Sequence, residues 1–420
     1  MNGSYLRLYA FAACASALTL ASCRAPESAF APATNFQGPS SSPAERRRFT
    51  ILLNFDGTNG SQPIGLTRVN GSNTLYGITE KGGRDNGGTF FSITPAGKEL
   101  VHYNFRSEDG EFPNSAPTPL KGLFYGLTSN FYCGIAGGPC GIIFSVPLSG
   151  HERILHRFRR NRYGRAPHGE SAENLSTLNG VLYGTAAGGK KSCIPSGFFT
   201  CGMIFSVTTS GDFHVVYYFK GPFPIGKDGA APDSLVGLDG ILYGTTGYGG
   251  TTGNGTFFSL TAAGKERVLY NFQGGSDGMT PVSLTVLDGK LYGTSYGGNG
   301  IGVCSYNGLG CGTVFSMTTT GRHRVLYRFK GGSDGWRPQH GLTVLDGKLY
   351  GTTQWGGRCA YCGTIFSVTP QGREEILHRF PNGHSVAGYG GSGLTPVDDT
   401  LYGTMPGGTH NAGTVFALTP

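Results

Sequence analysis

Apolar and polar residues alternate in short stretches that recur along the chain. Residues 99–105 (ELVHYNF), 152–158 (ERILHRF) and 266–272 (ERVLYNF) are three examples, each ending in Phe. An alternation with period two is typical of a β-strand with one buried face. Three further apolar elements accompany each stretch: one like SLTVLDG (283–289), a Leu-Tyr-Gly element and a Gly-Thr-x-Phe element. Because Gly, Asp-Gly or Pro separates these elements, the sequence predicts four short strands joined by tight turns.

The four elements form one unit that is repeated seven times. The Tyr of the Leu-Tyr-Gly element marks each unit, at Tyr76, Tyr125, Tyr183, Tyr243, Tyr292, Tyr350 and Tyr402. The gaps between these tyrosines are 49, 58, 60, 49, 58 and 52 residues, with a mean near 54. Four strands in a period of this length are typical of a β-propeller blade. The sequence therefore predicts an all-β protein, a seven-bladed β-propeller with four-stranded blades.

The two ends of the repeat region predict how the ring closes. The last unit stops at GTVFALTP (413–420) without an outer strand, whereas residues 49–55 (FTILLNF) form an outer strand without a blade. We expect residues 49–55 to join the last unit and complete blade seven, so that no strand edge is left open. The alternative is a linear solenoid, which would leave three strands at one end and one at the other.

Loop lengths divide the two faces of the predicted ring. We expect each blade to run outward from the ring centre in chain order, starting with the SLTVLDG-like strand. The turn between the first and second strands and the turn between the third and fourth strands are nearly constant in length and then lie on one face. The links from the second to the third strand, and from one blade to the next, vary in length and lie on the other face, here called the long-loop face. From the Gly of Leu-Tyr-Gly to the Gly of Gly-Thr-x-Phe the offset is 11, 15, 18, 11, 19, 12 and 10 residues. Variable loops on a rigid scaffold commonly carry binding sites, so we expect a ligand on the long-loop face.

The first 22 residues predict an export signal. Arg7 precedes an apolar run over residues 8–20, too short to span a bilayer, and the sequence Leu-Ala-Ser-Cys follows, ending at Cys23. This ending resembles the bacterial lipobox, which implies cleavage before Cys23 and a lipid such as palmitate on the protein. Ordinary signal cleavage that leaves Cys23 free is the alternative. Residues 23–48 are rich in Ala, Pro and Ser and predict a flexible tether, which leaves 49–420 for the propeller.

The repeat resembles the GloVer tandem repeat of exported bacterial proteins that carry varied surface anchors. The matching motifs are LYGTT with Gly-Gly, then GTxFSxTPxG, then the VLYxF strand, and together they cover roughly residues 49–420. Blades two and three depart most, since blade two reads FYGL at 124–127 and blade three lacks the Asp-Gly before its first strand. The resemblance implies an exported, anchored repeat protein and supplies no catalytic residues.

Eight cysteines form four pairs, each within one variable loop. The pairs are Cys133 and Cys140, Cys193 and Cys201, Cys304 and Cys311, and Cys359 and Cys362. In an oxidising compartment the favoured interpretation is four local disulfides that close the longer loops, each worth about 2–3 kcal/mol. The last pair, a CxxC, is also typical of redox and zinc sites. A reactive thiolate, however, is usually stabilised by a helix N-terminus, and zinc needs four ligands.

Blade six carries the sharpest local sign of a ligand site. Both tryptophans of the chain, Trp336 and Trp355, fall in its long-face loops, near His340 and Tyr361. Clustered aromatic rings on an exposed face stack on sugar rings and anchor other interfaces. The alternative is packing, because Trp355 aligns with tyrosines of two other blades.

The sequence contains no clear catalytic or metal motif. Asp-Gly pairs recur between the outer strand of one blade and the inner strand of the next, at Asp109, Asp228, Asp277 and Asp334. We expect these aspartates to cap their turns and not to act as acids, bases or metal ligands. An enzyme needs one unrepeated cluster of titratable groups, whereas nearly all polar positions here recur from blade to blade.

Charge and composition narrow the choice of partner. Charged residues make up 14% of the chain and the formal net charge is +8, but aromatic residues do not interleave with a long basic stripe, so we expect no nucleic-acid partner. We expect a monomer anchored in the bacterial envelope by lipid on Cys23, in the outer membrane if the cell has two membranes. It would bind an envelope glycan or protein without catalysis or a cofactor. A glycan-active lyase or hydrolase on the same scaffold is the alternative, and a structural spacer is a third.

Overall fold

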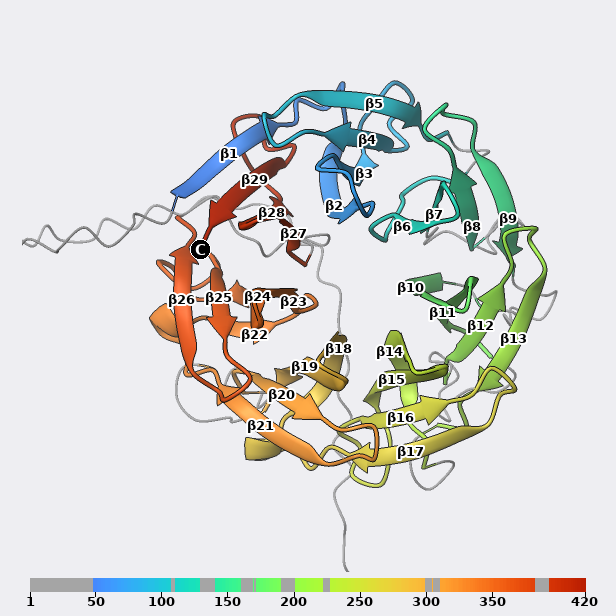
Figure 1. The fold of residues 1–420 in the computed structure, drawn as a ribbon, viewed down its shortest axis with the longest axis vertical. Coiled ribbons are helices and arrows are strands. Elements are labelled where there is room, and N and C mark those ends of the chain that lie inside the picture. Colours follow the sequence, from blue (N-terminus) through green and yellow to red (C-terminus); the bar gives the residue numbers. More distant parts are fainter. Residues whose placement is uncertain are drawn as a thin grey trace, which may run out of the picture. The chain divides into compact units, whose positions relative to one another are not determined.

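The computed structural model describes residues 48–106, 110–128, 140–159, 169, 171–189, 201–221, 227–298, 304, 310–381 and 393–420. These residues form seven antiparallel sheets arranged as blades around a common centre (Figure 1). The seven-bladed β-propeller predicted from the sequence is therefore confirmed. No helix among the described residues is long and apolar enough to cross a membrane.

In each of the first four blades the strands run from the centre outward in chain order. Blade one comprises β2 (Ser61–Arg68), β3 (Leu75–Lys81), β4 (Thr89–Ile93) and β5 (Glu99–Asn104). Blade two comprises β6 (Thr118–Leu120), β7 (Leu123–Leu127), β8 (Gly141–Val146) and β9 (Arg153–Phe158). Blade three comprises β10 (Ser171–Leu178), β11 (Val181–Ala187), β12 (Met203–Val207) and β13 (Phe213–Tyr218). Blade four comprises β14 (Ala230–Leu238), β15 (Ile241–Tyr248), β16 (Thr256–Leu260) and β17 (Glu266–Asn271).

In the described residues, a short 3-10 helix opens each of blades five and six, and the inner strand of blade six is divided. Blade five has η1 (Gly275–Asp277), β18 (Met279–Leu287), β19 (Lys290–Gly297), β20 (Thr313–Met317) and β21 (His323–Arg328). Blade six has η4 (Gly332–Asp334), β22 (Trp336–Pro338), β23 (Thr343–Leu345), β24 (Lys348–Trp355), β25 (Thr364–Val368) and β26 (Glu374–Arg379). Blade seven has β27 (Thr395–Val397), β28 (Thr400–Met405), β29 (Thr414–Thr419) and, as its outer strand, β1 (Arg48–Asn54).

Strand β1 closes the ring. It pairs antiparallel with β29, with Phe49 opposite Leu418 and Thr50 opposite Ala417. The N-terminal strand thus completes the sheet that the C-terminal repeat begins, as predicted, and the linear solenoid is wrong.

The same aromatic contact lies at the middle of every blade. The Phe of the third strand lies against the Gly of Leu-Tyr-Gly on the second strand, and a Cβ added to Gly77 would come within 2.4 Å of Phe91 Cζ. The seven contacts are Gly77–Phe91, Gly126–Phe144, Gly184–Phe205, Gly244–Phe258, Gly293–Phe315, Gly351–Phe366 and Gly403–Phe416. Only glycine leaves room for the ring, which explains why the two motifs occur together in each repeat.

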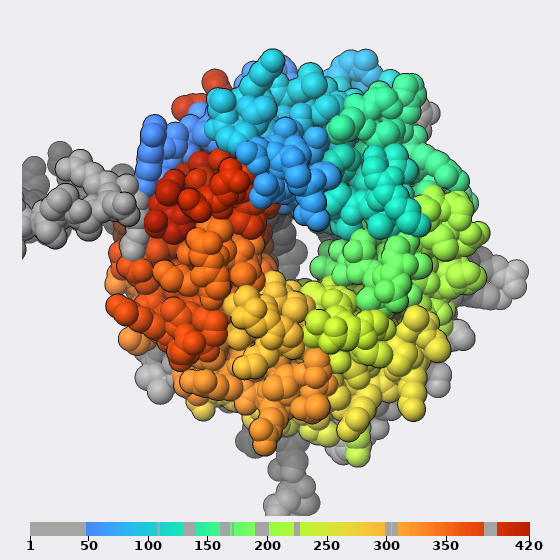
Figure 2. All heavy atoms as spheres, viewed as in Figure 1, coloured from blue at the N-terminus to red at the C-terminus, as the bar shows by residue number. Residues whose placement is uncertain are grey.

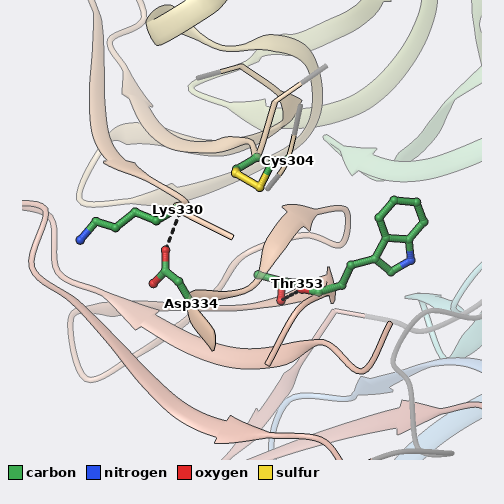
Figure 3. Close-up of a disulfide and its surroundings, with 6 residues drawn as sticks. Cys304, Lys330, Asp334 and Thr353 are labelled. Carbon is green, nitrogen blue, oxygen red and sulfur yellow. Dashed lines mark hydrogen bonds between the residues drawn. A yellow bond between two sulfur atoms is a disulfide. The ribbon is translucent and has the colours of Figure 1, made fainter. Parts of the chain in front are cut away.

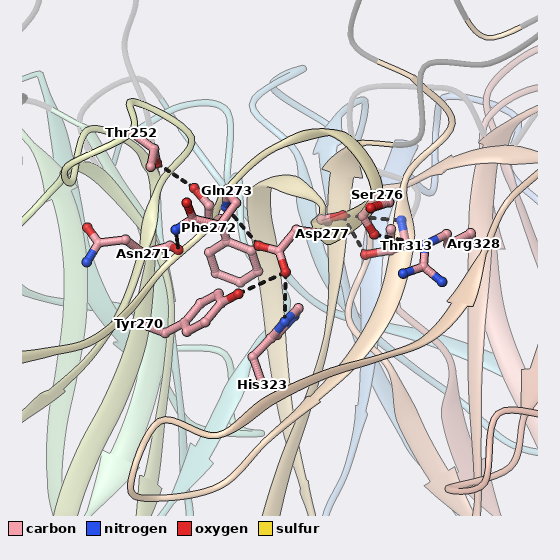
Figure 4. Close-up of polar contacts among 11 residues, drawn as sticks. Thr252, Tyr270, Asn271, Phe272, Gln273, Ser276, Asp277, Thr313, His323 and Arg328 are labelled. Atoms are coloured by element: carbon pink, nitrogen blue, oxygen red, sulfur yellow. Dashed lines mark hydrogen bonds and ion pairs between the residues drawn. The ribbon is translucent and has the colours of Figure 1, made fainter.

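Neighbouring blades are joined where one outer strand ends and the next begins (Figure 1). Between blades four and five, Tyr270 Oη donates a hydrogen bond to Asp277 Oδ1 at 2.8 Å, and His323 Nδ1 lies 3.1 Å from the same oxygen. The rings of Tyr270 and His323 stack with their centroids 4.7 Å apart (Figure 4). Burial raises the pKa of Asp277, but hydrogen bonds from His323, Gln273 and Tyr270 outweigh it and leave the pKa below its ordinary value.

Two other blade seams repeat this arrangement with a glutamate in place of the histidine. Tyr217 donates to Asp228 at 2.7 Å beside Glu266, and Tyr327 donates to Asp334 at 2.8 Å. Each aspartate also accepts a backbone N–H from its own turn, that of Lys220, Gln273 or Lys330. Asp228, Asp277 and Asp334 therefore cap their turns as expected, and Asp109 lies outside the described residues.

At two further seams both partners change together. His156 takes the place of the tyrosine and stacks on Phe213 at 3.7 Å, and His378 stacks on Phe49 at 4.0 Å. Phe213 and Phe49 stand where other blades have Glu or His at the start of the outer strand. The Phe49–His378 pair therefore couples the closing strand to blade six.

Phe49→Ala tests this closure. Phe49 contacts His378, Phe380 and Phe416, so we expect the free energy of unfolding to fall by about 3 kcal/mol, the usual loss for a packed Phe. Ile51→Ala on the same strand, at a side chain 36% exposed, should lower it by less than about 1 kcal/mol. Urea unfolding measures both variants. Equal, small losses would contradict a ring held closed by β1.

Glu374→Gln tests the seam between blades five and six. Burial and the nearby Asp334 carboxylate raise the pKa of Glu374 from 4.5 to about 7. The folded state therefore holds this proton more tightly than the unfolded state, and stability falls as the pH rises through this range. The Gln variant should match the natural protein at about pH 4 and be more stable at about pH 8. The gain should be at most about 1 kcal/mol, because the side chain is only partly buried and solvent screens its charge. Thermal unfolding at both pH values measures it, and an identical difference at both would contradict this account.

Candidate functional site

The inner strand of blade six is interrupted, and the predicted ligand residues of this blade lie on either side of the interruption or within it. Strands β22 and β23 each pair with β24, and residues 339–342 between them leave the ladder. The matching stretch of blade five, MTPVSL (279–284), is one residue shorter than WRPQHGL (336–342). The extra residue is accommodated by dividing the strand.

Three of the four predicted ligand residues lie together on this blade. Trp336 pairs with Trp355 across β22 and β24, and their ring centroids are 4.5 Å apart. The ring of Tyr361 meets Trp355 edge-on at 5.7 Å. Trp336 is 8% exposed and Tyr361 is 65% exposed. Of these three side chains, Tyr361 presents the most surface to a partner.

A buried cation occupies the aromatic faces of this cluster. The Arg337 guanidinium carbon lies 3.8 Å from the Trp355 ring centroid and 4.7 Å from that of Tyr296 on blade five. Arg337 is 5% exposed, and burial lowers its pKa while Tyr296 opposes the shift. The rings of Trp355 and Tyr296 are thus engaged in joining two blades, which favours the packing interpretation for this part of the cluster.

The disulfides brace the loops around the same cluster. Cys304–Cys311 and Cys359–Cys362 are bonded, which confirms two of the four predicted pairs. The Cys304 bond lies near the turn in which Asp334 accepts the backbone N–H of Lys330 (Figure 3). The Cys311 carbonyl accepts the backbone N–H of Arg337 at 2.8 Å, so this disulfide loop supports the start of blade six.

The other predicted cysteine sites are only partly described. Cys140 and Cys201 are also disulfide-bonded, but their predicted partners Cys133 and Cys193 lie outside the described residues, as does Cys23. In the CxxC the two sulfurs bond to each other, so neither is free to bind zinc. Within the described ranges, no three His, Cys, Asp or Glu side chains are grouped to hold a metal ion.

The fourth predicted residue, His340, lies in the interruption of the inner strand and lines a cavity at the ring centre. This cavity has a volume of about 510 Å³, and Figure 2 shows the hollow between the blades. Its described polar lining includes Asn114, Glu173, Asn174 and His340, and its apolar lining includes Ile64, Leu66 and Leu175. The wall therefore combines residues of blades one, two, three and six.

A recurring β-bulge places side chains in this cavity. The pairing register slips around Ile64 in β2, Glu173 in β10 and Val282 in β18, and β14 slips at Asp233. A bulge re-aims the side chain of the extra residue, and both Ile64 and Glu173 line the cavity. Asp233 occupies the corresponding place on the strand next to Glu173.

Burial perturbs the titratable groups at the ring centre. It raises the pKa of Glu173, and it raises the pKa of Asp233 to about 8 with a further contribution from the Glu173 charge. It lowers the pKa of His340 to about 4. His340 is therefore uncharged at neutral pH. Among the described residues that line the cavity there is no Lys or Arg.

Three polar atoms in the cavity wall have no hydrogen-bond partner among the described residues. Asn114 Nδ2 donates to the Ala172 carbonyl at 2.9 Å, which leaves Asn114 Oδ1 unpaired. Asn174 Oδ1 and His340 Nε2 are unpaired as well, and each of the three atoms has less than 1 Å² of accessible surface. An unsatisfied buried polar group costs about 1–3 kcal/mol, which a ligand with suitable donors can offset once these side chains turn toward it.

Sequence reasoning missed Asn114, Glu173, Asn174 and Asp233. The sequence did offer a signal at one position of the inner strand, which follows Pro in most blades. It is the third residue of the tripeptides QPI, FPN, SAE, APD, TPV and RPQ in blades one to six. Its residue changes in every blade while the flanking motifs recur. This position is an exception to the expectation that polar positions repeat around the ring.

The Gloeobacter/Verrucomicrobia repeat matches this sequence over residues 40–232, 141–306 and 192–416. The chain belongs to this family. The three matches together extend over almost the whole ring, and they agree with the resemblance carried by the LYGTT and GTxFSxTPxG motifs. No curated protein sequence matches this member of the family.

Several solved structures are similar in fold to this member of the repeat family. The computationally designed Ika8 protein has a TM-score of 0.46 and 14% identity, over 83% of this chain and 81% of that one. A gluconolactonase from Xanthomonas campestris has a TM-score of 0.43 and 12% identity, over 79% and 90%. A puromycin hydrolase has a TM-score of 0.50 and 10% identity, over 84% of this chain and 51% of the hydrolase. At these identities the likeness concerns the fold alone.

Arg337→Ala tests whether the aromatic cluster is structural. We expect the free energy of unfolding to fall by about 2 kcal/mol, because the variant loses a desolvated cation–π contact and its packing. Tyr361→Ala should change it by less than about 0.5 kcal/mol, because most of that ring is exposed. Denaturant unfolding of both variants checks this. An Arg337→Ala variant as stable as the natural protein would contradict a packing role.

Proposed function

We propose that this repeat protein is a non-catalytic propeller, lipid-anchored in the bacterial envelope, that binds the end of a glycan in its central cavity. The export signal in residues 1–22 and the lipobox-like sequence before Cys23 support the anchor. The disulfides fit an oxidising compartment outside the cytoplasm. The tether of residues 23–48 would give the ring reach from the membrane surface.

The observation that carries this proposal is the unrepeated lining of the cavity. Its volume of about 510 Å³ falls within the roughly 300–1,000 Å³ of small-molecule sites. Glu173, Asn114 and His340 come from three different blades and have no counterpart of the same residue type at that position in the other described blades. A ring that served only as a spacer has no need for such asymmetry at its centre.

The central cavity is a better candidate than the long-loop face of blade six. Trp336 is buried, and Trp355 is covered on one face by the Arg337 guanidinium. The remaining exposed ring, Tyr361, offers a single stacking surface. A contact there is compatible with a secondary role in holding a longer glycan.

A glycan-cleaving hydrolase is the second candidate, favoured by one observation. Glu173 and Asp233 are two carboxyl groups with raised pKa values on adjacent inner strands, the kind of pair that general acid–base catalysis uses. Binding is preferred because, among the described residues, no hydrogen bond links the side chains of Glu173, Asp233 and His340 to one another or to a nucleophilic side chain. A catalytic set needs such mutual geometry.

A cavity-filling variant tests the proposal. The full chain, purified in detergent, is incubated with oligosaccharides released from envelope polysaccharide, and the bound sugar is quantified. Leu175→Trp should weaken binding by at least about tenfold, because the indole occupies the cavity. Tyr361→Ala should bind nearly as the natural protein does. The Cys23→Ser variant should no longer be found in the membrane fraction, because it lacks the lipid anchor, and it should bind the oligosaccharides as the natural protein does.

Two results would contradict the proposal. Loss of binding in Tyr361→Ala together with full binding in Leu175→Trp would place the site on the long-loop face. Release of new reducing ends from the oligosaccharides by the natural protein, abolished by Leu175→Trp, would favour the hydrolase.

A further inference from the structure

A second groove lies between blades one and two, on the face opposite the long-loop face. This opposite face carries the turns from first to second strand and from third to fourth strand, and is here called the short-turn face. The groove has a volume of about 380 Å³. Its apolar lining includes Val69, Leu120, Phe124 and Leu148. Arg68 and Lys121 are the charged residues of its described lining, so the groove combines apolar surface with positive charge.

Lys121 departs from the repeat at a turn that other blades build with Asn or Asp. The residues that hold this place, with φ between 48° and 52°, are Lys121, Asn179, Asp239, Asp288, Asp346 and Asp398. Asn and Asp adopt this left-handed conformation more readily than lysine does. The turn itself thus gives no reason for a lysine, whose exposed side chain lines the groove.

Leu148 is a second departure in the same groove. It stands in the outer turn of blade two, at the place that the other described outer turns give to Pro95, Thr209, Ala262, Thr319 and Pro370. Its side chain is 46% exposed, although a leucine gains free energy by leaving water. The Leu148 carbonyl lies 3.1 Å from His102 Nδ1, which fixes this turn against blade one. Exposed leucine beside cations is typical of surfaces that enter the headgroup region of a membrane.

The turn of blade one that borders the groove is longer than its counterparts. It extends over residues 69–74, whereas Lys121 and Gly122 alone connect β6 to β7. Arg68 Nε donates a hydrogen bond to the Ser72 carbonyl at 2.7 Å, and Arg68 Nη2 donates to Asn73 Oδ1 at 3.1 Å. The extended turn therefore holds the guanidinium in the groove wall. A guanidinium and an ammonium group in one apolar groove match the phosphate of a phospholipid.

The chain enters the ring on the same face. Strand β1 begins at Arg48, opposite Thr419 at the end of β29. In the other blades the outer strand begins after the short turn that follows the third strand, so Arg48 lies on the short-turn face. Blade seven is next to blade one (Figure 1). A flexible tether of the length of residues 23–48 spans roughly 25–30 Å. The proposed lipid anchor would thus hold the short-turn face toward the membrane.

We propose that the groove between blades one and two binds the headgroup of an anionic phospholipid in the membrane that carries the anchor. Arg68 and Lys121 hold the phosphate, and Leu148 enters the apolar edge of the bilayer. The long-loop face is then turned away from the membrane. This inference rests on the lipid anchor of the proposed function and not on its glycan site. The groove alone binds weakly and reversibly, because stable membrane attachment takes two signals.

Vesicle titration of the mature Cys23→Ser chain, residues 23–420, tests the groove without the anchor. Vesicles of phosphatidylcholine alone are compared with vesicles that contain an equal amount of phosphatidylglycerol, and sedimentation separates the bound protein. We expect binding to the anionic vesicles only, weakened by added salt. Lys121→Asn suits the turn and should weaken binding about fivefold, the contribution of one cation at an anionic surface. Leu148→Thr, which introduces the residue of blades three and five, should weaken it by a similar factor.

Arg358→Asn is the matched control, because it removes an exposed cation from the long-loop face of blade six. It should bind as the parent chain does, and thermal unfolding should show that all three variants remain folded. A loss equal to that of Lys121→Asn would overturn the assignment to the groove. Equal binding to both kinds of vesicle, or binding to neither, would overturn the anionic-lipid assignment.

A competition separates the lipid from a free phosphate diester. Glycerophosphoglycerol, the water-soluble headgroup, should compete poorly at a concentration equal to that of the lipid. Full competition would assign the groove to a soluble ligand and overturn the membrane assignment. Each of these failures would leave the proposed function standing, because the anchor is tested by the membrane fraction of the natural protein and the glycan site is tested in detergent.

Discussion

The aromatic ring of the third strand lies on the glycine of the second strand in all seven blades, and the rest of the structure depends on this contact. A Cβ on Gly77 would approach Phe91 Cζ to 2.4 Å, so the packing tolerates no larger residue. Because the contact fixes the middle of each sheet, the blades have one shape despite loops of very different length. A uniform blade shape is what allows seven repeats to close into a ring with one strand borrowed from the other end of the chain.

The constraint weakens from the middle of the blade toward its two edges. At the outer edge the seams still require matched partners, either tyrosine with aspartate or histidine stacked on phenylalanine. At the inner edge the strands bulge or break, and the residues at the bulges and at the break, such as Ile64 and His340, differ from blade to blade. The ring centre is therefore the place where sequence can change without disturbing the blade core, and it is where an asymmetric site has formed.

The ring was predictable because its determinants repeat. Seven copies of Leu-Tyr-Gly and Gly-Thr-x-Phe report the same contact seven times, and the unpaired strand at 49–55 implies the closure. A further signal was present in the pairs His378 with Phe49 and His156 with Phe213, which change together because they stack across a seam.

The candidate site was less predictable for physical reasons. A bulge shifts the alternation of inward and outward side chains, so the two-residue period does not reveal that Glu173 faces the cavity. The burial of Trp336 depends on its pairing with Trp355 and on the seating of Arg337, which are contacts between strands and between blades. His340 separates from the aromatic cluster because one extra residue divides the inner strand. Such effects follow from three-dimensional packing, and no local motif records them.

The central claim is that ligand binds at the ring centre. Hydrogen exchange of the full chain, with and without an envelope oligosaccharide fraction, tests it most directly because it locates the protected backbone. The account predicts slower exchange with ligand in β10, in β14 and in residues 336–342, with residues 355–362 unchanged. Protection confined to residues 355–362, with the inner strands exchanging as in the free protein, would contradict it.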